Sequence, residues 1–110
     1  MELELIIMNI INFSGESRSL CMEAIGYAKN GYFEKAGKAL EEAGDKLSEA
    51  HQSQTRLIQE EARGKGEPIS LLLAHAQDHL MNAITMRDMA NEFIELYRAV
   101  REIKGAESHE

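Results

Sequence analysis

Apolar residues recur at steps of three and four along nearly the whole chain, and no other feature of the sequence restricts the fold as strongly. Residues at this spacing lie on one face of an α-helix. The 110-residue chain contains a single proline, Pro68, and few β-branched valines, a composition that is unlike that of a sheet protein. The sequence therefore predicts an all-α protein.

The periodicity falls into three segments, which predict helices at about residues 3–30, 32–63 and 68–104. Gly31 is expected to end the first helix in a left-handed conformation. The stretch RGKGEP separates the second and third helices, and Pro68 suits the first helical position because that position needs no backbone N–H. Two short turns between long helices predict an antiparallel up-down-up three-helix bundle, and we expect residues 1–110 to form one domain.

Glycines inside the predicted helices carry further information. Ser14 and Gly15 lie in the middle of the first segment, where they could kink the helix or separate a short N-terminal piece. Gly37 and Gly44 lie in the second, whose seven-residue rhythm of alanine and leucine is typical of a tightly packed bundle. Glycine in a helix interior costs about 1 kcal/mol relative to alanine, so we expect another helix backbone to approach there.

The number of apolar positions points to self-association. Each helix of a three-helix bundle contacts two others, yet the first and third segments carry more apolar positions than one neighbour requires. A chain of this length also buries only part of its surface by itself. We therefore expect a homo-oligomer.

The charge of the chain limits its partners and its compartment. The net charge of −7 disfavours nucleic acid and favours a basic protein partner. The lone Cys21 excludes an internal disulfide and fits a reducing cytosol. The opening MELELIIMNII is too short to cross a membrane and follows acids rather than bases, unlike a signal peptide. We expect a cytoplasmic protein with no membrane insertion.

A polar cluster interrupts the third segment, in the stretch LLLAHAQDHLMNA at residues 71–83. His75, Asp78, His79 and Asn82 are spaced so that they share one face of a helix. The apolar line of Leu72, Leu73, Ala76, Leu80 and Ala83 runs beside them. The polar cluster is therefore expected to border the buried stripe rather than to point directly into water.

Four interpretations of this cluster compete. The histidines are hydrogen-bonded boundary residues, or they ligate zinc with Asp78 as a third ligand, although two histidines on one helix seldom suffice. A third possibility is a nucleophile, because imidazole is largely uncharged at neutral pH and its free lone pair can attack and hold a phosphoryl group. The fourth is a histidine phosphotransfer domain, which usually has Lys-Gly shortly after its histidine, whereas Asp78 stands third after His75.

The string His-Ala-Gln-Asp-His-Leu-Met at residues 75–81 resembles the active-site helix of one protein family. This is the lactose/cellobiose (N,N'-diacetylchitobiose) family of IIA components of the bacterial phosphoenolpyruvate-dependent sugar phosphotransferase system. The stretch SLCMEAIGYAKNGYFEKAGKALEEAGDKLSEA is also similar to the family's first two helices, so the resemblance covers essentially the whole chain. Ala74 and Asn82 depart from the commoner residues at their positions, but both lie outside the central motif.

The resemblance implies a phosphoryl carrier that assembles as a homotrimer, a nine-helix bundle. His75 would accept phosphate from the phosphohistidine of HPr and pass it to a cysteine of the cognate IIB protein, for uptake of a β-linked disaccharide. Asp78 from each subunit would bind a divalent metal ion, Mg²⁺, at the three-fold axis. Gln77 and His79 would support the site.

The other candidate residues suggest no separate chemistry. Cys21 lies on the apolar stripe of the first segment, and His51 and His109 are expected to be solvated. The methionines are expected either in the core or in an adaptable docking surface around His75. The alternative to a carrier is a non-catalytic helical interaction or metal-binding protein. The sequence leaves the sugar open.

Overall fold

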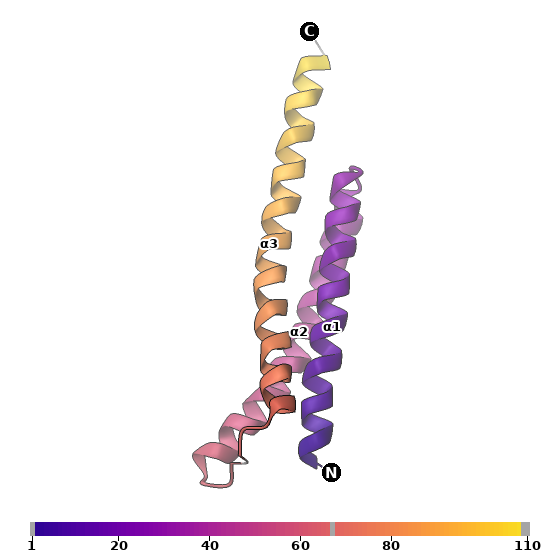
Figure 1. Ribbon diagram of the computed structural model, residues 1–110. Coiled ribbons are helices and arrows are strands. Elements are labelled where there is room, and N and C mark those ends of the chain that lie inside the picture. The colour runs from indigo at the N-terminus through magenta and orange to yellow at the C-terminus, as the bar shows by residue number, and fades with distance from the viewer. Residues whose placement is uncertain (1, 67, 109–110) are drawn as a thin grey trace.

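The computed structural model describes residues 2–66 and 68–108, which form three antiparallel helices and no strand. The helices are α1 (Glu2–Lys29), α2 (Phe33–Ala62) and α3 (Leu71–Ser108). They make an elongated bundle of 67 × 20 × 17 Å (Figure 1). The prediction of an all-α, up-down-up bundle is confirmed, and the predicted ends differ from the observed ones by one to four residues.

Two glycines end α1 and α2 in the same way. Gly31 has φ +87° and Gly64 has φ +78°, the left-handed region that glycine adopts without steric cost. The N–H of the next residue reaches back across each end, from Tyr32 to the carbonyl of Tyr27 at 2.8 Å and from Lys65 to that of Glu60 at 2.9 Å. These bonds satisfy carbonyls that would otherwise lack partners at a helix end, and the predicted stop at Gly31 is confirmed.

The start of α3 differs from the prediction. Pro68 lies outside the helix, and Ser70 forms the cap instead: its Oγ accepts the N–H of Leu73 at 3.1 Å and its carbonyl accepts that of Ala74 at 3.0 Å. A serine side chain satisfies a free N–H of the first turn, which proline cannot do. The helix therefore begins at Leu71, directly after the capping serine.

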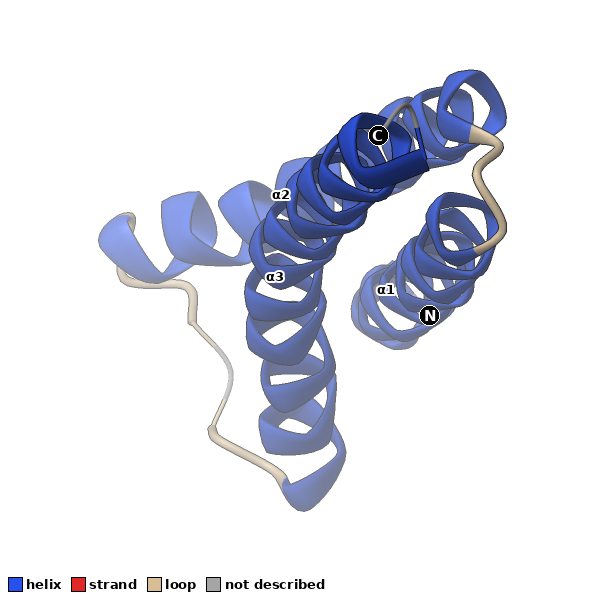
Figure 2. Ribbon diagram, turned by 90° about the horizontal axis from the view of Figure 1, so that it is seen from above, coloured by secondary structure: helices blue, strands red, loops and turns tan. Residues whose placement is uncertain are grey.

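Small residues line the seams between the helices. Most of the buried apolar positions are alanines, with isoleucines towards the start of α1; the alanines are Ala24, Ala28, Ala36, Ala39, Ala43, Ala50, Ala76, Ala83 and Ala90. Without long side chains between them, the backbones come close together. α1 packs against both other helices, whereas α2 and α3 contact each other less, and the end of α2 swings away from the bundle (Figure 2).

The interior glycines behave differently from the prediction. α1 is one helix through Ser14 and Gly15, so no short piece separates. No atom comes within 4 Å of a Cβ built on Gly37, and the group over Gly44 is the guanidinium of Arg87 rather than a backbone. The expectation of a close helix backbone at Gly37 and Gly44 is therefore wrong for the single chain.

One face of α3 stays uncovered, and we call it the free face. Its members follow each other at steps of three and four, and all are exposed: Leu71, His75, Asp78, Asn82, Thr85, Met89, Phe93, Leu96, Val100 and Ile103. The face is polar near the start of α3 and apolar towards its end, where α3 extends beyond the α1–α2 turn (Figure 1). Phe93 and Val100 lie here because this side of α3 faces away from α1 and α2, whereas the nearby Ile94 and Tyr97 pack against those helices.

None of the helices in the described part of the chain is long and apolar enough to span a membrane.

Two buried serines of α1 provide a matched pair for measuring one hydrogen bond. The Oγ of Ser17 donates to the carbonyl of Ala43 at 2.8 Å, whereas the Oγ of Ser14 has no partner among residues 2–66 and 68–108. Both serines are fully buried in the same helix, so replacement by alanine changes helix propensity equally. We expect Ser17→Ala to be less stable than Ser14→Ala by about 1 kcal/mol in urea unfolding. Equal stabilities would show that the Ser17 bond contributes nothing.

Candidate active site

The polar part of the free face lies in the first turns of α3. The Ser70 cap fixes where α3 begins, and His75 follows one turn later on an exposed position. Asp78 and Asn82 are exposed on the same face, and only His79 is half-buried. The expectation that the whole cluster borders the core is therefore wrong in the single chain. Asp78 lies two residues from the buried Leu80, about 200° around the helix, and points away from it.

The two histidine rings contact each other directly. The Nε2 atoms of His75 and His79 are 3.1 Å apart, the ring centroids are 4.5 Å apart, and the planes are nearly perpendicular at 89°. A hydrogen bond between two such nitrogens requires a proton on one and a lone pair on the other. The contact therefore makes the tautomer of one ring depend on that of the other.

The surroundings of His79 decide which ring donates. Its Nδ1 is buried and has no hydrogen-bond partner in the part of the chain that the structure describes. Buried N–H groups without an acceptor are rarer than buried acceptors without a donor, so we assign the proton of neutral His79 to Nε2. His79 then donates to His75, whose Nε2 carries a lone pair on an exposed ring.

Gln77 lies on the other side of α3 from the histidines. It is half-buried, and its Oε1 accepts a hydrogen bond from Nε2 of Gln54 on α2 at 2.8 Å. It lies two positions after His75, which places it about 200° around the helix. Within one chain Gln77 therefore joins α3 to α2 and does not contact His75.

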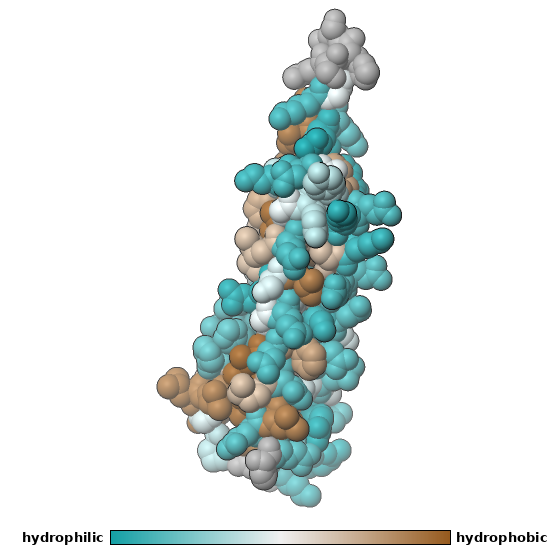
Figure 3. All heavy atoms as spheres, turned by 90° about the vertical axis from the view of Figure 1, so that its right-hand side faces the viewer, coloured by the Kyte–Doolittle hydropathy of each residue, from teal (hydrophilic) through white to brown (hydrophobic). Residues whose placement is uncertain are grey.

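Large apolar side chains surround the start of α3. Leu71 is 89% exposed, and Met81 is 57% exposed. Ile69, in the loop before the helix, is 86% exposed. Figure 3 shows apolar side chains gathered near the end of the molecule where α3 begins, while polar side chains cover most of that face. Exposed apolar groups rimmed by polar ones are typical of protein-binding surfaces.

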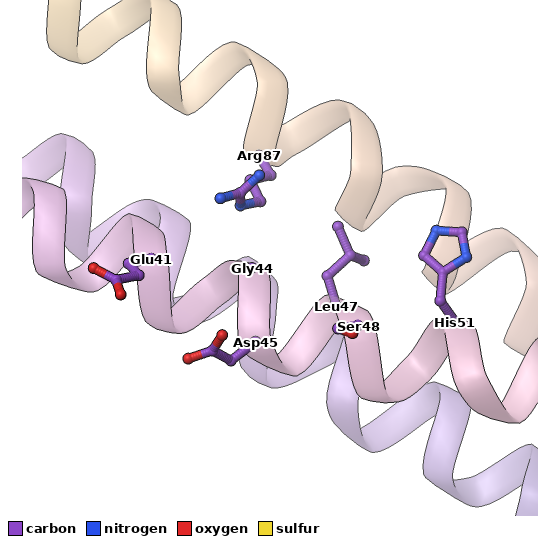
Figure 4. A pocket seen from close by; sticks show the side chains of 7 residues that line it. All are labelled: Glu41, Gly44, Asp45, Leu47, Ser48, His51 and Arg87. Atoms are coloured by element: carbon purple, nitrogen blue, oxygen red, sulfur yellow. The ribbon is translucent and has the colours of Figure 1, made fainter.

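A groove that no sequence pattern predicts lies between α2 and α3. It is further along the bundle than the histidine pair. Arg87 reaches from α3 towards Gly44, and its Nε donates to the carbonyl of Leu40 at 3.3 Å (Figure 4). His51 lies two turns further along α2 and lines the same groove. A periodicity argument treats a residue such as Arg87 as a core position or a surface position, so it misses a long side chain that spans two helices.

Comparisons with known proteins agree with this geometry. The family profile for "PTS system, Lactose/Cellobiose specific IIA subunit" matches residues 5–98. The chain belongs to the lactose/cellobiose IIA family. It is 53% identical over 105 residues to the lichenan-specific phosphotransferase enzyme IIA component of Bacillus subtilis, covering 96% of each chain.

Solved IIA structures have the same fold. The cellobiose-specific enzyme IIA of Bacillus anthracis superposes with a TM-score of 0.90 at 48% identity, covering 93% of this chain and 94% of that one. The IIA(Chitobiose)–HPr complex of Escherichia coli gives a TM-score of 0.80 at 39% identity, covering 92% and 98%. The resemblance read from the HAQDHLM motif is confirmed at the level of the family.

Other candidate residues of this IIA component fall outside the histidine site. His51 is exposed, as predicted, and His109 lies outside the described residues. Cys21 is fully buried, also as predicted. Burial raises the pKa of its thiol above the ordinary value of 9.0, an effect that the positive charge of Arg87 and a hydrogen bond with Ser17 only partly offset.

The environment of Cys21 predicts an unreactive thiol. The thiolate is the reactive form, and both the raised pKa and the burial reduce its availability. We expect Ellman's reagent to label the folded protein far more slowly than the urea-unfolded protein at pH 8. Because Cys21 is the sole cysteine, Cys21→Ala should give no signal. Equal rates in the folded and unfolded protein would mean that the site opens readily.

Proposed function

We propose that this IIA component is a phosphoryl carrier that accepts phosphate from phospho-HPr on Nε2 of His75 and passes it to a cysteine of the cognate IIB protein. The single observation that carries the proposal is the exposed His75 ring, whose Nε2 lies 3.1 Å from Nε2 of His79. Membership of the family and the likeness to an IIA solved with HPr support it. The lone Cys21 suits a relay in the cytoplasm.

The transfer needs only a lone pair and two docked partners. The lone pair of His75 Nε2 attacks phosphorus, while the bond from phosphorus to the donor imidazole breaks and the donor nitrogen keeps that electron pair. In the second half, a thiolate of IIB attacks phosphorus and His75 regains its lone pair. Both partners would reach His75 across the exposed apolar residues at the start of α3.

His79 has a positioning role in this proposal. Before transfer its Nε2–H donates to Nε2 of His75, which holds the ring in the tautomer that can attack. Once that nitrogen is bonded to phosphorus it accepts no hydrogen bond, and the same N–H is free to donate to a phosphoryl oxygen. A hydrogen bond to a charged oxygen is stronger than one between neutral groups. Gln77 supports the site indirectly, by holding α3 against α2.

The free face supports a homotrimer. Its steps of three and four are the spacing of a coiled-coil seam, and its apolar half has no cover within the chain. Three copies joined along this face would form a nine-helix bundle with the α3 helices at the centre. The apolar positions from Met89 to Ile103 would supply most of the buried surface.

The same arrangement would bring three Asp78 carboxylates together. Carboxylate oxygens are hard ligands that suit Mg²⁺, and the described residues of one chain contain no group of three metal ligands, so a site of this kind needs several copies. Asp78 is exposed on the free face one turn from His75, a position that fits such a shared ion. The ion would supply positive charge near three carboxylates and near phosphohistidine, all of which repel each other.

The relatives support a class of substrate. Three of them are named for lichenan, cellobiose and chitobiose, which contain β-linked sugars. We propose that this chain serves the uptake of a β-linked disaccharide, although it does not touch the sugar itself.

Radiolabel from phosphoenolpyruvate tests the carrier. With enzyme I and HPr, we expect label on the wild type and on His51→Ala, a control at the exposed histidine of α2, but none on His75→Ala. His79→Ala should be labelled about ten to a hundred times more slowly, the effect of losing one hydrogen bond to a charged group. Label on His75→Ala equal to the wild type would refute the assignment.

Replacement of Asp78 tests the link between metal and assembly. We expect Asp78→Leu to remain a trimer in analytical ultracentrifugation, to resist urea at least as well as the wild type, and to bind no Mg²⁺, because three like charges are replaced by apolar groups. Asp88→Leu, at an exposed acid of α3 outside the free face, should keep the ion. Monomers of Asp78→Leu would instead mean that metal-bound carboxylates hold the subunits together.

A further inference from the structure

The histidine pair has a geometry that suits a second ligand besides phosphate. The Nε2 atoms of His75 and His79 are 3.1 Å apart, and the rings meet edge to face. Two imidazole nitrogens on a tetrahedral zinc lie about 3.3 Å apart, given Zn–N bonds of about 2.0 Å. A shift of a few tenths of an ångström and a small ring rotation therefore bring both nitrogens onto one ion.

We infer that His75 and His79 chelate a transition-metal ion of the Zn²⁺ type and that the bound ion blocks phosphorylation of His75. Histidines four residues apart on a helix supply two of the ligands in known zinc sites, where a third protein ligand completes the set. The described residues contain no group of three histidine, cysteine or carboxylate ligands, so water fills the remaining positions of the ion. Such an open site exchanges its metal readily and is inhibitory rather than structural.

The proton balance makes binding reversible. Both nitrogens must offer a lone pair, so neutral His79 moves its proton from Nε2 to Nδ1 and none is released to solvent. The new N–H lies at a buried position without a partner in the described chain, which opposes binding. The two metal–nitrogen bonds must outweigh this cost, and the ion leaves when a chelator competes for it.

The inhibition rests on the proposed carrier function, whereas the binding does not. Nε2 of His75 has one lone pair, so it bonds either to the ion or to phosphorus. Because coupling between two ligands is reciprocal, zinc must oppose phosphorylation and phosphorylation must oppose zinc.

The kind of ion separates this site from the proposed Asp78 site. Imidazole suits zinc, nickel and copper, whereas carboxylate oxygen suits magnesium. Mg²⁺ and Zn²⁺ carry the same charge, so a general electrostatic effect on phosphate transfer would be equal for both. Ligation by the imidazole pair predicts an effect of Zn²⁺ alone.

Binding is measured first, by calorimetric titration of the protein with ZnCl₂ in the presence of Mg²⁺. We expect one zinc per chain for the wild type and for the control His51→Gln. Affinity should fall at least tenfold in His75→Gln and in His79→Gln, each of which loses one ligand. Equal affinity in the wild type and His79→Gln would overturn the proposal.

Transfer is measured second, from preformed phospho-HPr, so that enzyme I is absent. We expect zinc at saturation to slow labelling of the wild type at least tenfold, and EDTA followed by excess Mg²⁺ to restore it, whereas added Mg²⁺ alone should not slow labelling. For His79→Gln the ratio of rates with and without zinc should be near one. Phosphorylated protein should also bind zinc at least tenfold more weakly.

The two proposals fail in different ways. If the wild type takes up no label even without zinc, the carrier function is refuted. The calorimetric titration still tests the metal site by itself. Normal labelling of zinc-saturated wild type would refute the block while the carrier stands.

Discussion

Small residues along the helix seams set how closely the three helices pack, and the position of the helix that carries the candidate site follows from this. Alanines at Ala76, Ala83 and Ala90 let one side of α3 lie close against its neighbours. A helix packed tightly on one side presents its opposite side as a continuous face. That is why His75, Asp78 and the apolar residues from Met89 onward share one uncovered surface, and why chemistry and self-association are proposed for the same helix.

The histidine contact depends on this packing as well. His79 is half-buried beside the core, so its ring has few orientations, whereas His75 is exposed. A fixed donor next to a reachable acceptor is a simple way to select one tautomer of a reactive imidazole. Gln54 and Gln77 add a polar tie between α2 and α3 on the other side, which keeps the helix that bears the site from sliding along the bundle.

The sequence predicted the architecture well because every helix has a strong three-four pattern and two have glycine stops. The prediction was wrong where a local hydrogen bond or the placement of the partner helices decides the structure. Ser70, rather than Pro68, caps α3. The serine oxygen accepts a backbone N–H of the first turn, whereas a proline ring only removes the need for one such bond. Phe93 and Val100 recur at helical spacing but are exposed, because the apolar pattern of one segment does not show which of its sides the partner helices cover. Within the candidate site, His75, Asp78 and His79 lie in neighbouring turns of α3, as the motif implies. Gln77 lies on another side of the helix, because residues that are close in sequence need not share a helix face.

The unequal helix lengths have a consequence for behaviour at low concentration. α3 has 38 residues against 28 and 30 for its partners, so its last turns have few tertiary contacts within the chain. Short helical stretches without such contacts are marginal in water. Order in this segment would then obey mass action. Fraying on dilution would begin at the C-terminal end of α3, while the histidine pair, more than about 40 Å away at a rise of about 1.5 Å per residue, stayed in place.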